Sequence, residues 1–156
     1  MGFSNLDQED LKELSRRTGQ ACVGFNLRKA SRLLMRLYDE AFEPLGLKGT
    51  QFSLLMAVVG NNGAAIGELA QPLGMERSTL SRNITVLQKK GLVTVEEGED
   101  RRQQRISITD SGVSVLQKAQ PLWQGVQERL ACELGEERIK NLLEDLKSLS
   151  QLFKGK

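Results

Sequence analysis

The stretch GMERSTLSRNITVLQKKGLVTVEEGEDRRQQRISITDS, residues 74–111, decides the fold that the sequence predicts. Its first half is an amphipathic helix, because Leu80, Ile84 and Leu87 recur on a 3.6-residue period and form one apolar stripe. The opposite face carries short hydroxyl side chains and basic side chains. Gly91 is the expected C-terminal cap of this helix.

After this helix the apolar period changes from 3.6 towards 2. Residues 92–95 and 105–108 are therefore predicted to be two short strands. Between them, residues 96–104 are turn-forming or charged, so we expect the tip of a β-hairpin that projects into solvent. Thr109 then supplies a hydroxyl N-cap for a new helix, with Asp110 favourable in its first turn. Helix, strand, basic turn, strand and capped helix is the order of a winged helix.

The polar face of the predicted helix suits double-stranded DNA. Hydroxyl and guanidinium groups near the N-terminal end of such a helix reach both phosphates and base edges in a major groove. An ordinary solvated helix face is the alternative interpretation, and the hairpin downstream favours DNA contact over it. The residues predicted to contact DNA from this helix are Arg77, Ser78, Thr79, Ser81, Arg82, Thr85 and Lys89.

These residues resemble the MarR family of bacterial winged helix-turn-helix transcriptional regulators. The motifs of that family are a hydroxyl-rich recognition helix, a Gly-Leu-Val strand start, an Asp-Arg-Arg wing and a strand that ends in Thr. The corresponding residues here are 77–79, 91–93, 100–102 and 106–109. Residues 44–58 also resemble the first two helices of the family and their link, so the resemblance covers most of the chain.

The resemblance implies a role for the wing. An arginine of the wing enters the minor groove, and Asp100 holds the turn by a salt bridge. Arg101 and Arg102 are the candidates, of which Arg102 is favoured, and a narrow minor groove attracts such a side chain. The alternative is a flexible charged turn.

Length and composition set the class of protein. A chain of 156 residues suits one domain with a sizeable core, and the net charge of +2 is too small to indicate a nucleic-acid partner by itself. No apolar run approaches the roughly 18 to 20 residues of a membrane span, and the first ten residues do not resemble a signal peptide. We therefore expect a cytoplasmic protein without membrane contact.

The residue inventory excludes several enzyme classes. With no His and only Cys22 and Cys132, one chain cannot build a four-ligand zinc site of His and Cys, a Ser-His-Asp triad or a Cys-His pair. No phosphate-binding loop is present either. We expect a protein that is not an enzyme and has no metal and no cofactor.

The first half of the chain is predicted to be helical. Residues 1–20 form a partly ordered polar arm in which Asp7 or Ser4 caps a short helix, and residues 21–42 form a long helix that is apolar on more than one face. Proline ends this helix at residues 43–44. Thr50 is the expected cap of the next helix, whose inward residues are Phe52, Leu55, Met56 and Val59.

Residues 66–73 form the supporting helix of the predicted helix-turn-helix. Gly67 is its expected cap, and Leu69, Ala70 and Leu73 face inward. Pro72 departs from the family pattern, because an internal proline removes a backbone donor and can kink the last turn. Such a kink would change the approach angle of the recognition helix.

The last third of the chain predicts two helices broken near Leu134-Gly135, with a kink near Pro121 in the first. The second carries apolar residues at spacings of three and four, which is a heptad seam. A small winged helix offers little surface to bury this seam, so we expect a second subunit to cover it, and the resemblance implies dimerisation through the terminal helices. The predicted dimerisation residues are Ile139, Leu142, Leu146, Leu149 and Phe153.

Cys22 has two interpretations. Some MarR-family members sense oxidants through a cysteine in the first long helix, which raises a redox role for Cys22. Reactivity requires a depressed thiol pKa, and the neighbours Val23 and Phe25 are apolar. A small buried apolar residue is therefore the favoured interpretation.

Together these observations predict a mostly α fold with a small β-hairpin wing, in one domain that spans residues 1–156. Residues 45–110 form the winged-helix DNA-binding part, and residues 1–44 and 111–156 form the dimerisation helices. We predict a homodimeric repressor of transcription on a pseudo-palindromic operator, and the resemblance implies modulation by a small-molecule effector. The alternatives are an oxidant sensor that uses Cys22 and a helical dimeric adaptor that does not bind DNA. Steep salt dependence would distinguish DNA binding from an apolar protein interface.

Overall fold

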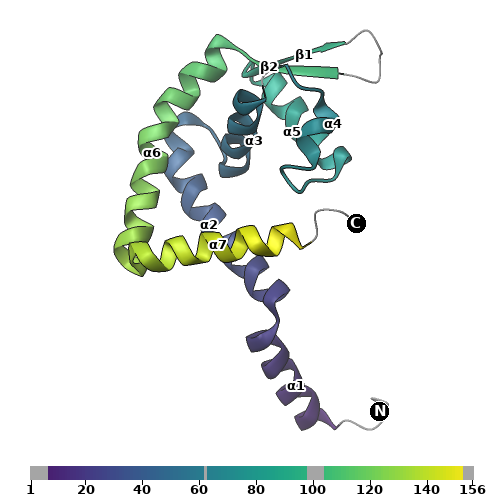
Figure 1. Ribbon diagram of the computed structural model, residues 1–156, viewed down its shortest axis with the longest axis vertical. Coiled ribbons are helices and arrows are strands. Elements are labelled where there is room, and N and C mark those ends of the chain that lie inside the picture. The colour runs from purple at the N-terminus through teal and green to yellow at the C-terminus, as the bar shows by residue number, and fades with distance from the viewer. Residues whose placement is uncertain (1–6, 62, 98–103, 153–156) are drawn as a thin grey trace. The chain divides into compact units, whose positions relative to one another are not determined.

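The computed structural model describes residues 7–61, 63–97 and 104–152 (Figure 1). The chain divides into two compact units, Met1–Leu37 and Tyr38–Lys156. The first contains α1 (Gln8–Ala21) and most of α2 (Val23–Phe42). The second contains the end of α2, the 3₁₀ helix η1 (Glu43–Leu45), the helices α3 (Gly49–Gly60), α4 (Ile66–Ala70) and α5 (Arg77–Lys89), the strands β1 (Val93–Glu97) and β2 (Gln104–Ile108), and the helices α6 (Asp110–Leu134) and α7 (Glu136–Gln151).

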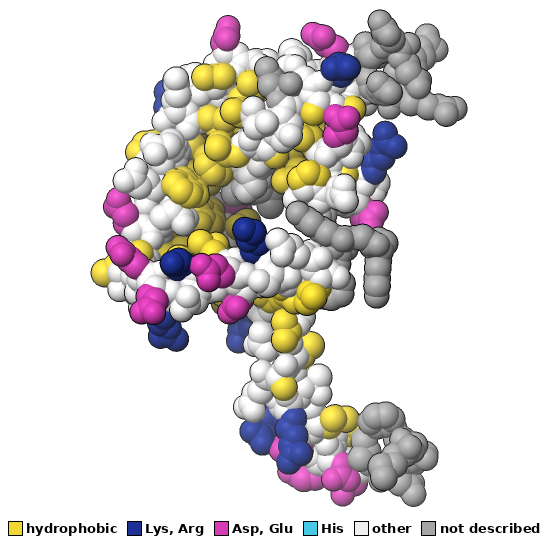
Figure 2. Space-filling model, viewed as in Figure 1, with side chains coloured by type: hydrophobic (Ala, Val, Ile, Leu, Met, Phe, Trp, Pro, Cys, Tyr) yellow, Lys and Arg dark blue, Asp and Glu magenta, His cyan; other side chains and the backbone are white. Residues whose placement is uncertain are grey.

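The polar arm is a helix of 14 residues, longer than the short helix that the sequence predicts. Asp7 is its N-cap, as predicted, and accepts hydrogen bonds from the backbone N–H groups of Glu9 at 2.8 Å and Asp10 at 2.9 Å. The Asp10 carboxylate in turn accepts from the N–H of Asp7, which completes a capping box. Figure 2 shows charged side chains of both signs gathered at this end of α1. Ser4, the other predicted cap, lies outside the described residues.

The core of the second unit lies among the short helices and the hairpin. Its largest fully buried side chains are Phe42, Leu54, Leu55, Val58, Leu69, Leu80, Leu87 and Ile106. The strands pair antiparallel in a register that sets Val95 opposite Ile106, and residues 63–65 add a short third segment along β2. There, Gly63 N–H donates to the Ile106 carbonyl at 3.0 Å, and Ile106 N–H donates to the Ala64 carbonyl at 3.1 Å. This third segment was not predicted.

Two predictions about α3 are wrong. The helix begins after Lys48 and not after Thr50, because the carboxylate of Asp39 accepts the Gly49 N–H at 2.8 Å and replaces a hydroxyl cap. Met56 and Val59 do not face the core: their exposed fractions are 48% and 44%. The buried face consists of Leu54, Leu55 and Val58. The inward position of Leu55 is therefore confirmed, and Phe52 packs against the core as predicted.

The predictions about the ends of α4 are also wrong. Ala65, not Gly67, is the N-cap, and Gly67 lies inside the helix. The helix ends at Ala70, so Pro72 lies in the turn beyond it and leaves the backbone hydrogen bonds of α4 intact. Leu69 is buried as predicted, with Ala70 and Leu73 packed against the core.

The two C-terminal helices are separated where the sequence predicts. Gly135 has φ +88° and stands between α6 and α7. α6 is continuous across Pro121, and a kink at that residue stays a prediction. None of the helices in the described ranges combines the length and apolarity that a bilayer crossing needs.

Candidate nucleic-acid interface

α5 presents the predicted polar face on a buried stripe. Leu80 and Leu87 are fully buried and Ile84 nearly so, which confirms the inward side of the helix. The residues predicted to contact DNA are all exposed: Arg77, Ser78, Thr79, Ser81, Arg82, Thr85 and Lys89. All seven side chains therefore lie on the exposed surface of α5. The buried apolar stripe determines which face of the helix points outward.

Two of these side chains are partly engaged within the protein. The guanidinium of Arg77 lies over Gly67 of α4, since a Cβ built on Gly67 would meet Nη2 of Arg77 at 3.4 Å. Gly67 therefore leaves room for Arg77 to cross α4. The Thr85 hydroxyl donates to the Ser81 carbonyl at 3.0 Å, so its proton is used inside the helix and its oxygen is left as an acceptor.

The C-terminal end of α5 is tied to two neighbouring segments. Lys90 Nζ donates to the Gly46 carbonyl at 2.6 Å and to Oε1 of Gln51 at 3.1 Å. Gly91 follows with φ +68°, as its predicted capping role requires. The role of Lys90 was missed, because Gly46 is 44 residues away in the sequence and no local pattern indicates such a contact.

Thr109 connects the hairpin to α6. Its hydroxyl accepts the Gly112 N–H at 3.0 Å, which confirms the predicted N-cap, and also donates to the Gly91 carbonyl at 2.7 Å. The Thr109 N–H donates to the Leu92 carbonyl at 3.1 Å. Gly112 is buried against this turn: a Cβ there would lie 2.2 Å from the Leu92 carbonyl oxygen. The first turn of α6 is therefore packed directly on the end of α5.

The hairpin brings a further arginine to this region. Arg105 of β2 is exposed, and its Nη1 donates to the Gly63 carbonyl at 3.1 Å. The predicted wing residues Asp100, Arg101 and Arg102 lie outside the described residues. Their roles in the minor groove and in support of the turn stay predictions.

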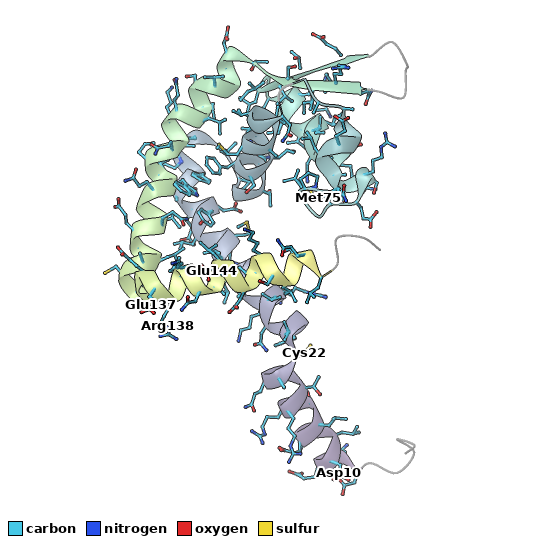
Figure 3. All side chains as sticks on the ribbon, viewed as in Figure 1. Asp10, Cys22, Met75, Glu137, Arg138 and Glu144 are labelled. Carbon is cyan, nitrogen blue, oxygen red and sulfur yellow. The ribbon has the colours of Figure 1, made fainter. Side chains whose placement is uncertain are left out.

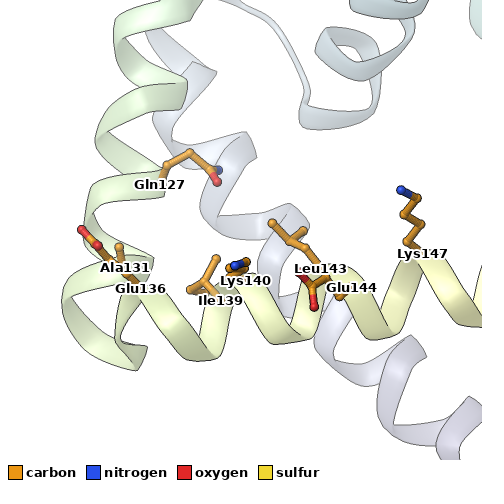
Figure 4. Close-up of a pocket in the computed structure, with 8 residues that line it drawn as sticks. All are labelled: Gln127, Ala131, Glu136, Ile139, Lys140, Leu143, Glu144 and Lys147. Carbon is orange, nitrogen blue, oxygen red and sulfur yellow. The ribbon is translucent and has the colours of Figure 1, made fainter.

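Four of the five predicted dimerisation residues lie on α7. Ile139, Leu146 and Leu149 are half-buried, Leu142 is 46% exposed, and Phe153 lies outside the described residues. An open groove of about 410 Å³ lies where α6 and α7 meet (Figure 4). Its lining combines apolar and charged side chains: Gln127, Ala131, Glu136, Ile139, Lys140, Leu143, Glu144 and Lys147.

Cys22 is exposed at the break between α1 and α2, so the prediction that it is buried is wrong (Figure 3). The break is the reason, because residue 22 caps α1 and does not lie inside a packed helix. Its sulfur accepts the Phe25 N–H at 3.4 Å. Cys132 on α6 is exposed as well.

Two ionisable side chains of α1 have shifted pKa values. Hydrogen bonds from Arg16 and then Arg17 lower the pKa of Glu13, and Glu13 raises the pKa of Arg16. These side chains are well exposed. Their pairing therefore supports α1 locally.

Comparisons with known proteins agree with this geometry. The sequence model of the MarR family matches residues 45–103. The regulator SarZ of Staphylococcus epidermidis is 26% identical over 130 residues, which are 83% of this chain and 85% of SarZ.

Two solved structures extend the likeness to the fold. The Mycobacterium tuberculosis transcriptional regulator MosR, solved in complex with DNA, is 38% identical with a TM-score of 0.74, over 85% of this chain and 98% of MosR. The transcriptional repressor CouR, solved on a 23-mer DNA duplex, is 26% identical with a TM-score of 0.75, over 94% of this chain and 99% of CouR. The predicted winged-helix fold is thereby confirmed, and this chain belongs to the MarR family of transcriptional regulators.

Proposed function

We propose that the protein is a cytoplasmic, homodimeric repressor that binds a pseudo-palindromic DNA operator. The observation that carries this proposal is the exposed polar and basic face of α5 over fully buried Leu80 and Leu87. Short hydroxyls and guanidinium groups on such a face suit phosphates and base edges. The DNA complexes of MosR and CouR support the same use of the fold.

We assign the side chains of this face to different DNA contacts according to their length and to the contacts they already make within the protein. Arg82 is long, exposed and near the middle of α5, so we assign it to a base edge. Lys89 at the last turn, and Arg77 over α4, are assigned to phosphates, which position a helix without reading sequence. Thr85, whose proton is already donated, is assigned to contact through its methyl group or as an acceptor.

A dimer would couple the two recognition helices through symmetry. Two copies of α5 must enter successive major grooves about 34 to 36 Å apart, so a change in the angle between subunits changes operator affinity. The exposed leucines of α7 favour the terminal helices as the interface. A small-molecule effector would act by changing that angle.

Arg82→Ala tests the proposal, with Arg129→Ala as the matched control. Arg129 is exposed on α6 and paired with Glu133, so its loss removes the same charge away from α5. At fixed salt, Arg82→Ala should weaken operator binding by about 1 to 3 kcal/mol and relax specificity at one base position, while Arg129→Ala should bind as wild type. Equal binding by wild type, Arg82→Ala and Arg102→Ala would contradict the DNA-contact assignment.

The adaptor alternative predicts a different response to salt. If the protein binds DNA through several cationic side chains, the logarithm of its affinity falls linearly and steeply with the logarithm of salt concentration. Binding of another protein through an apolar surface should hardly respond. A titration of the partner at several salt concentrations separates the two functions.

Exposure of Cys22 favours a second candidate, in which oxidation of this thiol modulates the regulator. An organic hydroperoxide would transfer one oxygen atom to the sulfur, giving a sulfenic acid and the corresponding alcohol. The test treats wild type and Cys22→Ser with dilute hydroperoxide and compares operator release before and after reduction. Reversible release by wild type alone would support the redox function, and release by neither would favour a small-molecule effector.

A further inference from the structure

The two ends of α5 are held differently. At its N-terminal end, the cap residue Glu76 makes no side-chain capping hydrogen bond. At its C-terminal end, the three residues 90–92 each take part in a contact with another element. These hydrogen bonds fix the C-terminal end of α5 to neighbouring segments, in addition to the packing of its buried stripe.

The first contact at this end is made by the N-cap residue of α6. One hydroxyl, that of Thr109, donates to the Gly91 carbonyl at 2.7 Å while it accepts the Gly112 N–H at 3.0 Å. The same oxygen thus caps α6 and anchors the turn that ends α5. Gly112 allows the approach, because any side chain there would overlap the Leu92 carbonyl.

The second contact is made with the segment that joins η1 to α3 and with the first turn of α3. Lys90 Nζ spans from the end of α5 to the Gly46 carbonyl at 2.6 Å and to the Gln51 amide oxygen at 3.1 Å. Gln51 Oε1 also accepts the backbone N–H of Lys48 at 3.2 Å, so the acceptor is itself fixed at the start of α3. The side chain of the exposed neighbour Lys89 makes no hydrogen bond within the described ranges, so the two lysines are a natural pair for comparison.

We propose that Thr109 and Lys90 are positioning residues that orient the recognition helix for reading an operator, an inference that rests on the proposed DNA binding. Contacts to base edges require the side chains to be placed within about 0.5 Å and 10–20°. Contacts to phosphates alone tolerate a small rotation, since they carry no sequence information. Loosening the end of α5 should therefore lower the ratio of operator affinity to non-specific DNA affinity, a ratio that a purely structural residue would leave unchanged.

Substitutions of Thr109 separate its two roles. Thr109→Asp keeps an excellent N-cap acceptor for Gly112 but has no hydroxyl to donate to Gly91, whereas Thr109→Ser keeps both functions. We expect Thr109→Asp to unfold near the wild-type temperature and to lose about tenfold in operator affinity, with non-specific affinity unchanged. Thr109→Ser should restore the wild-type ratio.

Ser111→Asp controls for the added negative charge. It places a carboxylate at an exposed position in the first turn of α6, two residues from Thr109. Its ratio of operator to non-specific affinity should equal that of wild type. The inference about Thr109 is wrong if Thr109→Asp keeps the wild-type ratio, or if Ser111→Asp lowers the ratio equally.

Lys90→Met and Lys89→Met provide the second comparison. Loss of a phosphate contact weakens binding to all DNA sequences and reduces the salt slope by about one, which is the result expected for Lys89→Met. Lys90→Met should lower operator affinity alone, with the slope unchanged. If Lys90→Met instead reproduces the result of Lys89→Met, Lys90 is a phosphate contact and its positioning role is refuted.

A measurement without DNA keeps the inference independent of the proposed function. Backbone amide chemical shifts along α5 should change in Thr109→Asp and stay as in wild type in Ser111→Asp. Wild-type protein that binds no DNA would refute the proposed function, while shifts in α5 would still show the positioning. Wild-type DNA binding together with unchanged shifts and ratios would refute the positioning role alone.

Discussion

Leucine side chains are buried in the winged-helix part but exposed on the terminal helices. Leu80 of α5 is fully buried, whereas Leu143 of α7 is 61% exposed. Neither α1 nor α7, both of them described along their whole length, contains a buried residue. The winged-helix part completes its core from one chain, and the terminal helices keep apolar side chains that a further surface can cover.

Leu→Ala at these two positions should give the largest contrast. Leu80→Ala removes a fully buried side chain, so the free energy of unfolding should fall by about 2 to 5 kcal/mol. Leu143→Ala is the control, because most of that side chain is already in water within the chain. Denaturant unfolding at low protein concentration measures both, and equal losses would contradict the division into a complete core and an uncovered surface.

A glycine pair on α6 sharpens the same comparison. Gly112→Ala would place Cβ 2.2 Å from the Leu92 carbonyl oxygen, so we expect a loss of about 1 to 3 kcal/mol from forced movement. Gly125→Ala meets nothing within 4 Å and should stabilise the helix by up to about 1 kcal/mol. Thermal unfolding should therefore shift in opposite directions. A shift in the same direction would mean that α6 does not dock on the end of α5.

The double variant Leu142→Ala with Leu149→Ala tests the uncovered surface. If these leucines form the dimer interface, the dissociation constant of the dimer should rise at least about tenfold, while the unfolding of the single chain changes little. Asn141→Ala with Ser148→Ala, two exposed polar positions of the same helix, is the control. Sedimentation at micromolar concentration decides, and a double variant that stays dimeric would place the interface elsewhere.

The smallest effect should come from acid titration of α1. Hydrogen bonds from Arg16 and Arg17 lower the pKa of Glu13 from the ordinary glutamate value of 4.5. The stabilisation is therefore fully present above 4.5 and is lost as the pH falls through the lowered pKa of the folded state. Exposure keeps the effect small. The protection of α1 amides against hydrogen exchange, taken relative to the intrinsic exchange rate at each pH, should fall in acid for wild type. Glu13→Gln should lose this added pH dependence, and Glu9→Gln is the control.

Local patterns were sufficient for most of the recognition surface. The stripe of Leu80, Ile84 and Leu87 predicted which face of α5 is exposed, and Thr109 and Gly91 were recognised as caps because capping depends on residues that are close in sequence. The hairpin strands were found within a residue or two of their ends.

Contacts between distant segments could not be predicted. The cap at Thr50 was misassigned because Asp39 supplies the acceptor for α3, and the contact of Arg77 with Gly67 was not predicted. The hydrogen bond from Lys90 to Gly46 and the pairing of residues 63–65 with β2 likewise join segments that are far apart in the sequence. Cys22 was misplaced for a different reason, since the break between α1 and α2 leaves no strong signal in that stretch.

The uninterrupted length of α6 has a mechanical consequence. At about 1.5 Å per residue, its 25 residues make a lever of about 37 Å, with its fulcrum near Gly135 and its working end at Thr109. A tilt of about 5° at the fulcrum displaces the working end by about 3 Å, which exceeds the roughly 0.5 Å tolerance of a site that reads base edges. A modest change at the α6–α7 junction would therefore be amplified into the difference between a recognition helix that fits its groove and one that does not.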